Sequence, residues 1–231
     1  MVETKIALID RLELCFAPQR WPFADQRRIE IDAHFAARCQ TQPLWNGRVL
    51  LLHEFSISQG VLRGAYLETD FASFLAWRDW GCPDAGVRNC FSLGAVRGAD
   101  GAFLLGVMAD HTANAGHIYF PGGTPDPSDV TGDAVDLYGS VVRELAEETG
   151  LCVDLMRPQP GWYAVLAGPR IAMIKVLESS LRAAELRDHV LAHLAKERTP
   201  ELADIRIVRA ADQFDPMMPA FVTAFLSYIW Q

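Results

Sequence analysis

The sequence contains few cysteines, and no two of them have the spacing of a metal-binding or redox motif. Its five cysteines are scattered, and none is separated from another by two residues. An odd, dispersed set of this kind argues against a disulfide framework or a zinc site and is typical of a chain in a reducing cytosol. We therefore expect a cytoplasmic protein.

The sequence also lacks a long apolar run and an excess of positive charge. Its apolar stretches are too short to span a bilayer, and the first ten residues, MVETKIALID, lack the basic and apolar regions of a secretion signal. The formal net charge of −8 disfavours binding of long nucleic acid through bulk electrostatics. A small phosphate compound is still a suitable ligand if metal ions supply positive charge. We expect a small-molecule partner, with neither a membrane nor long nucleic acid involved.

The apolar content is high enough for a sizeable core. Hydrophobic residues make up 50% of the 231 residues, enough for one large domain or a domain with an extension. Strand-like and helix-like segments alternate irregularly, which favours an α/β or α+β sandwich. The pattern changes near residue 88. We therefore expect an N-terminal α+β extension over residues 1–87, with a role in substrate recognition, and a second domain over residues 88–231.

Several elements can be placed from local signals. Residues 70–81, DFASFLAWRDWG, predict a helix capped by Asp70, and residues 89–108 predict a β-hairpin with a GADG turn. A loop rich in Gly, Pro and Asp then leads to a helix with Asp136 at its N-cap and Gly150 just beyond its last turn.

That helix carries a dense group of acids. In RELAEETGL, residues 143–151, Glu144, Glu147 and Glu148 fall at the i, i+3 and i+4 positions of one helix side. Like charges at this spacing repel by a few tenths of a kcal/mol per pair, a cost that bound divalent cations remove. Oxygen-rich carboxylate sites suit Mg²⁺ or Mn²⁺. Glutamate-rich faces are commonly just solvated surface, so the flanking residues must decide between the two interpretations.

Those flanking residues resemble a known motif. RELAEETGL resembles the C-terminal half of the Nudix box, G-x5-E-x7-R-E-U-x-E-E-x-G-U, in which U is a bulky aliphatic residue. FPGG, residues 120–123, is similar to the turn that opens the box in this family. The resemblance covers residues 88–231 and implies the Nudix fold, a mixed sheet between helices. The matching positions are Arg143, Glu144, Leu145, Glu147, Glu148, Gly150 and Leu151.

The spacing departs from the family pattern. Gly123 lies 20 positions before Arg143, six more than the pattern has. Counting back eight positions from Arg143 reaches Val135, where the family has a glutamate. Asp133 could stand in for that glutamate, whereas Asp136 is better explained as the helix cap.

The resemblance implies an activity and a set of site residues. It implies Mg²⁺- or Mn²⁺-dependent hydrolysis of a pyrophosphate bond in a nucleoside diphosphate linked to another group, with an NDP-sugar or ADP-ribose as the expected substrate. The implied catalytic residues are Glu144, Glu148 and Arg143. The implied metal ligands are Gly123, Glu144, Glu147 and Glu148, and we add Glu201 from beyond the box, with Glu197 as the next choice.

Substrate contacts are less well marked. We expect Arg88, Arg97 and Arg170 to contact phosphate. Candidates for stacking on a base are Trp77, Trp80, Trp162 and Tyr163, although such aromatic residues more often belong to the core. The lengthened loop and the missing glutamate support one alternative, a catalytically silent Nudix-fold protein that binds a nucleotide and regulates another process. A homodimer is common in the family and is an option here.

Overall fold

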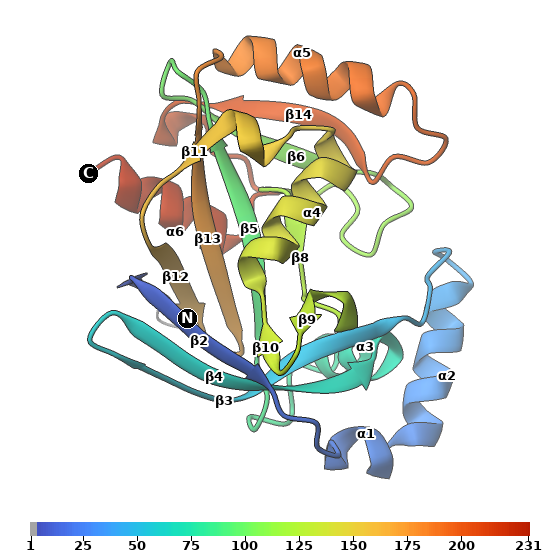
Figure 1. Ribbon diagram of the computed structural model, residues 1–231. Coiled ribbons are helices and arrows are strands. Elements are labelled where there is room, and N and C mark those ends of the chain that lie inside the picture. Colours follow the sequence, from blue (N-terminus) through green and yellow to red (C-terminus); the bar gives the residue numbers. More distant parts are fainter. Residues whose placement is uncertain (1–3) are drawn as a thin grey trace.

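The computed structural model describes residues 4–231, which form a nine-stranded and a five-stranded sheet (Figure 1). The main path of the large sheet runs β1-β12-β13-β5-β6-β14, and within it β5 and β13 are parallel while the other neighbours are antiparallel. Its strands are β1 (Thr4–Ile9), β5 (Asn89–Arg97), β6 (Phe103–Met108), β7 (Ile118–Tyr119), β8 (Gly122–Gly123), β11 (Met156–Pro158), β12 (Trp162–Ala167), β13 (Arg170–Ser179) and β14 (Leu202–Val208).

The small sheet is built mostly from the N-terminal part of the chain. Its order is β3-β4-β2-β10-β9, and two of its five strands come from the loop that precedes the acidic helix. The strands are β2 (Arg11–Phe16), β3 (Arg48–Ser58), β4 (Val61–Asp70), β9 (Val130–Thr131) and β10 (Ala134–Val135). The expected mixed α+β architecture is confirmed.

Helices cover both faces of the large sheet. Helix α6 (Ala220–Ile229) packs on one face through a cluster rich in phenylalanine, while α4 (Leu137–Thr149) and α5 (Ala183–Leu194) pack on the other. Strand β5 serves both layers, since Cys90 and Val96 belong to one cluster and Phe91 and Leu93 to the other. This alternation follows from the two-residue period of a strand. The sheet therefore lies between helices, as expected.

A smaller helical layer packs against the five-stranded sheet. It consists of α1 (Pro22–Gln26), α2 (Arg28–Cys39) and α3 (Phe71–Asp79) around a third apolar cluster. The predicted cap of α3 is confirmed, because the Asp70 side chain accepts a hydrogen bond from the Ser73 N–H at 2.9 Å. Short 3-10 turns lie at η1 (Pro127–Asp129), η2 (Val153–Leu155) and η3 (Ala211–Gln213).

The first strands connect the two sheets. The strand-like segment KIALIDRLELCF divides at Asp10, with β1 in the large sheet and β2 in the small one. The N–H groups of Asp10 and Arg11 both donate to the carbonyl of Gly60 at the break. Residues N-terminal to position 88 thus supply an edge strand to the C-terminal sheet, and the division at residue 88 remains a proposal. Among residues 4–231, no helix has the length and apolar character needed to cross a bilayer.

Candidate functional site

Helix α4 presents its carboxylates beside a buried stripe. Leu137, Val141 and Leu145 are buried against the sheet, and both predicted ends are confirmed. The Asp136 side chain accepts from the N–H groups of Tyr138 and Gly139, and Gly150 has the left-handed φ of 68° that closes the helix. Strong local caps and one apolar face fix the rotation of the helix, and with it the direction of its acids.

Glu148 is buried although it is a carboxylate. Its residue is 7% exposed, its Oε1 accepts a long 3.4 Å hydrogen bond from the Gly122 N–H, and its Oε2 has no partner among residues 4–231. Burial raises its pKa well above the usual range, and the charges of Glu144 and Glu201 raise it further. An unpaired buried carboxylate oxygen is costly, so this position fits a cation.

Glu144 and Glu201 lie close enough to Glu148 for their charges to raise its pKa. Burial raises the pKa of Glu144, against the lowering effect of the Arg143 guanidinium, and Glu201 adds to the rise. Glu201 is the residue just before β14, and its carbonyl accepts a hydrogen bond from the Ala109 N–H at 2.8 Å. Glu201, the ligand expected from beyond the box, lies beside the acids of α4.

Gly123 borders the same group of acids. The β5–β6 hairpin diverges after its turn, and β8 pairs with β5 through Leu93–Gly122 and Ser92–Gly123. Gly122 has a φ of 137°, and a Cβ there would lie 2.2 Å from the Ser92 carbonyl oxygen, so only glycine fits. A Cβ on Gly123 would lie 3.7 Å from Glu144 Oε1. The turn therefore brings backbone against the carboxylates.

Arg143 is held by a buried aspartate that the sequence analysis missed. Its Nη2 donates to both carboxylate oxygens of Asp129, at 3.1 and 3.2 Å, and its Nη1 donates to Glu144 at 2.7 Å. The Asp129 side chain is 2% exposed and also accepts from the Asp126 N–H at 3.0 Å. Asp129 thus fixes the arginine that orients Glu144.

This geometry corrects the assignment of Val135 to the acidic position of the box. Residues 124–128 separate Gly123 from Asp129, which is the G-x5-acid spacing of the pattern when it is counted forward from the glycine. The six additional residues lie after Asp129, in the β9–β10 hairpin, and not before it. Val135 is a buried apolar residue of the core, and Asp133 points its backbone carbonyl to the Phe16 N–H at 2.7 Å.

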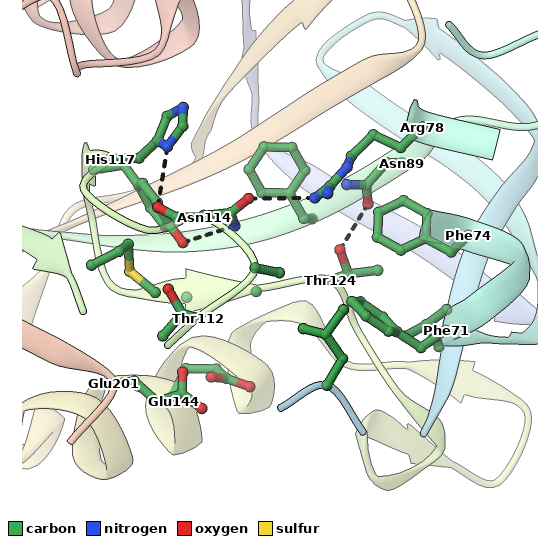
Figure 2. Close-up of a pocket in the computed structure, with 18 of the residues that line it drawn as sticks. Phe71, Phe74, Arg78, Asn89, Thr112, Asn114, His117, Thr124, Glu144 and Glu201 are labelled. Carbon is green, nitrogen blue, oxygen red and sulfur yellow. Dashed lines mark hydrogen bonds between the residues drawn. The ribbon is translucent and has the colours of Figure 1, made fainter. Parts of the chain in front are cut away.

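The acids border a large cavity between the two sheets. Its volume is about 800 Å³, and five of the nine predicted site residues line it. In Figure 2, Glu144 and Glu201 lie on one side, and Phe71, Phe74 and Arg78 lie on the other. The five predicted residues in the lining are Gly123, Glu144, Glu148, Arg170 and Glu201.

The remaining predicted residues lie elsewhere. Glu147 is 62% exposed and contacts Arg143 at 3.3 Å on the outer side of α4. Neither Arg88 nor Arg97 is part of the cavity lining: the Arg88 guanidinium lies over the Phe55 ring at 4.6 Å, and Arg97 donates to the Gly101 carbonyl in the hairpin turn. Glu197 pairs with His193 at 3.2 Å, also outside the lining.

The aromatic residues expected to stack on a base are also placed differently. The cavity lining does not include Trp77, Trp80, Trp162 or Tyr163. Trp77 donates its Nε1–H to the Asp84 carbonyl within the N-terminal core. Aromatic rings that do line it include Trp45, Phe71, Phe74, Phe91 and Phe221. Phe71, Phe74 and Arg78 share one face of α3 at helical spacing, which is a signal that the sequence analysis could have used.

A metal site at these acids would need a rearrangement of their side chains. Among the described residues, no three His, Cys, Asp or Glu side chains are already grouped as metal ligands. Glu144 is drawn toward Arg143, while Glu148 keeps one unpaired oxygen. Carboxylate oxygens and a nearby glycine backbone are suitable donors for Mg²⁺ or Mn²⁺, so the residues fit such an ion.

Comparisons with known proteins found similarity only at the level of structure. No family model matches the sequence, and no curated protein matches it. A Nudix hydrolase from M. smegmatis, RenU, is 17% identical and has a TM-score of 0.40, covering 61% of this chain and 81% of its own. A MutT protein from Methanosarcina mazei Go1 is 19% identical with a TM-score of 0.40, covering 61% and 91%. Because these identities and TM-scores are low, the chemistry of the site is inferred from its own residues.

Proposed function

We propose that this protein is a Nudix-type hydrolase that uses divalent cations to cleave a pyrophosphate bond. Its substrate would be a nucleoside diphosphate linked to another group, with an NDP-sugar or ADP-ribose as the first choices. The cavity of about 800 Å³ has room for such a compound. The matched box residues and the geometry around Glu148 support the proposal.

The observation that carries the proposal is the unpaired Oε2 of Glu148. It is buried beside two further carboxylates, Glu144 and Glu201, at the wall of the cavity. The charges of Glu144 and Glu201 raise the pKa of Glu148, so the three carboxylates need either a proton or a cation to remain together. A site that gathers cations at a cavity wall is suited to a substrate with several negative charges.

The residues of the chain have distinct roles in this proposal. Gly123, Glu144, Glu148 and Glu201 would hold the cations from the cavity lining, and Glu147 would join them from the solvent side of α4. When bound, Mg²⁺ or Mn²⁺ would supply the positive charge that offsets the diphosphate and would activate water. Glu148 or Glu144 would orient the attacking water and accept its proton. Arg143, fixed by Asp129, would position Glu144 without touching the reacting atoms.

The alternative, a catalytically silent nucleotide-binding protein, now has less to support it. One of its two supporting observations was the missing acid of the box, and we propose that Asp129, paired with Arg143, takes the place of that acid. The longer loop is the one remaining observation that supports the alternative.

Release of a nucleoside monophosphate and a second phosphorylated product tests the activity directly. We would incubate the protein with Mg²⁺ and a panel of NDP-sugars, ADP-ribose, dinucleoside polyphosphates and nucleoside triphosphates. Glu148→Gln keeps the side-chain shape but loses the charge, so we expect turnover to fall by about 100-fold or more. Equal inertness of wild type and variant, while both bind a nucleotide, would establish the alternative instead.

A matched control separates this effect from a general loss of charge. Glu54 has a side chain that is 79% exposed on β3 and lies outside the main cavity, so Glu54→Gln removes one carboxylate at a distance from the site. We expect its turnover to equal that of the wild type.

A further inference from the structure

The side of the cavity that faces the acids has a different chemistry. Phe71 and Phe74 project from one face of α3, with their ring centroids 6.0 Å apart in an edge-to-face arrangement. Figure 2 shows both rings on the cavity wall, away from Glu144 and Glu201. Val49 from β3 and Leu44 from the preceding loop extend the apolar surface. This wall comes entirely from the N-terminal part of the chain.

Polar groups with spare hydrogen-bonding capacity border that wall. Asn89 accepts from Thr124 Oγ1 through its Oδ1 at 3.0 Å, which leaves its NH₂ group to donate elsewhere. The Arg78 Nη1 donates to the Asn114 Oδ1 at 3.4 Å, and both residues line the cavity. Amide donors next to aromatic rings suit a flat, apolar ring system with polar edges.

Arg170 provides an available positive charge in the lining. It is exposed, and no hydrogen bond or ion pair joins its guanidinium to another described residue. The other two arginines of the lining both pair with Asp79. Arg38 lies 2.7 Å from its carboxylate and Arg78 lies 3.1 Å from it. Arg170 is therefore suited to an anionic group, and its planar fork matches a phosphate.

We propose that the wall formed by Phe71 and Phe74 is a subsite for the nucleobase of the substrate, and that Arg170 contacts a phosphate group of the same molecule. This inference rests on the proposed function, because the diphosphate is what connects the base to the acids. It assigns base recognition to the N-terminal part of the chain and diphosphate binding to the C-terminal part.

Two probes that resist hydrolysis separate the base from the diphosphate. Adenosine α,β-methylene diphosphate carries both parts, while methylenediphosphonate carries only the second, and the P–C–P linkage prevents turnover. We would measure the Kd of each with Mg²⁺ by calorimetry on the full chain. If the base stacks on these rings, Phe74→Ala should raise the Kd of the adenosine probe by about 10-fold or more. Methylenediphosphonate should bind this variant as it binds the wild type.

Other variants keep the test decisive if Phe74→Ala folds poorly. Phe74→Leu retains most of the apolar volume, and Phe71 is only half-buried, so Phe71→Ala is expected to fold. Trp80 is the matched control: it lies at the C-terminal end of α3 and packs on Arg27 at 4.3 Å, outside the cavity lining. Trp80→Ala should leave both Kd values unchanged.

The arginine has its own matched pair of variants. Arg170→Ala should weaken both probes by a similar factor, about 10-fold, because the contact is to phosphate. Arg88→Ala should change neither, since Arg88 lies over Phe55 away from the cavity.

The possible outcomes distinguish the two proposals. The nucleobase subsite is wrong if wild type binds methylenediphosphonate but the adenosine group adds no affinity. It is also wrong if Phe74→Ala weakens the binding of both probes equally. In either case the pyrophosphohydrolase proposal stands. An alkyl methylenediphosphonate that binds as tightly as the adenosine probe would show a general apolar site and would also overturn the subsite. If wild type binds neither diphosphate probe in Mg²⁺, the proposed function fails, and the subsite fails with it.

Discussion

Helix α4 and the loop over residues 124–136 both position the acidic group, but the forces that fix them differ. The helix is fixed by local features, its Asp136 and Gly150 caps and an apolar stripe. The loop is held from outside: the Leu50 N–H donates to the Pro125 carbonyl at 2.7 Å, the Phe16 N–H donates to the Asp133 carbonyl, and Ala134 pairs with Cys15. Sequence patterns therefore describe the helix well and the loop poorly.

Removal of divalent cations is expected to have the largest effect. If the acids of α4 serve to hold cations, a chelator such as EDTA should reduce turnover by about 1,000-fold or more, and added Mg²⁺ should restore it. The fold should remain, because the core clusters do not include these acids. Circular dichroism checks the fold, and Mg²⁺ should raise the Tm because it binds the folded state. Full turnover in EDTA would contradict the proposed role of the helix.

The next largest effect should come from Asp129, which links the loop to the helix. Asp129→Ala leaves Arg143 without its buried partner, so we expect turnover to fall by about 10- to 100-fold through misplacement of Glu144. Asp129→Glu should recover part of this loss, since a carboxylate returns. Asp126 lies 4.0 Å from the same guanidinium and is the matched control, with Asp126→Asn expected to lose less.

A circular dichroism melt separates positioning from unfolding in these variants. Loss of turnover in Asp129→Ala without loss of folded protein at the assay temperature indicates a positioning role. A variant that turns over normally would show that Arg143 orients Glu144 unaided.

The contrast explains how far the sequence could predict this molecule. The ends of α4 and the cap of α3 depend on neighbours within three or four positions, so they could be read directly. The acid of the box could not be located by counting back from Arg143, because the inserted hairpin follows Asp129 and its strand partner is Cys15, far away in sequence. Phe71 and Phe74 line the same cavity as Gly123 only because of the arrangement of the two sheets, which no local pattern encodes.

Shortening the loop would test whether its insertion is needed by the site. The Asp136 N–H donates to the Asp129 carbonyl at 2.8 Å, so the two ends of residues 130–135 already meet. Deletion of these six residues removes the buried Val135 side chain and the pairing with β2, and we expect it to cost about 3 kcal/mol of stability. Because Asp129 and Arg143 lie outside the deleted segment, turnover should remain within about tenfold of the wild type.

Urea unfolding and a turnover assay measure the two effects of this deletion separately. A loss of stability without a loss of turnover would show that the hairpin attaches the five-stranded sheet and does not position the acids of the site. Turnover lost in a protein that remains folded would show that the sheet positions the site through the loop.

The smallest effect should be found at Asp70, where local capping and a distant partner act on one side chain. Burial opposes ionisation, but hydrogen bonds from Arg28 and Ser73 outweigh it and lower the pKa of Asp70 from its ordinary value of 3.8. A carboxyl group with a lowered pKa in the folded state adds stability above its ordinary pKa, and the protein loses that contribution as the pH falls through the folded value. Asp70→Asn keeps a good cap but loses the charge, so it isolates the Arg28 pair, which lies at 2.8 Å.

We expect Asp70→Ala to cost about 1 kcal/mol of stability at pH 7 and Asp70→Asn to cost less, as measured by urea unfolding. The difference between wild type and Asp70→Asn should shrink as the pH falls below 4, because wild-type Asp70 then takes up a proton. A difference that stays constant down to that pH would mean that the Arg28 pair adds nothing, and that the start of α3 is fixed by its local cap alone.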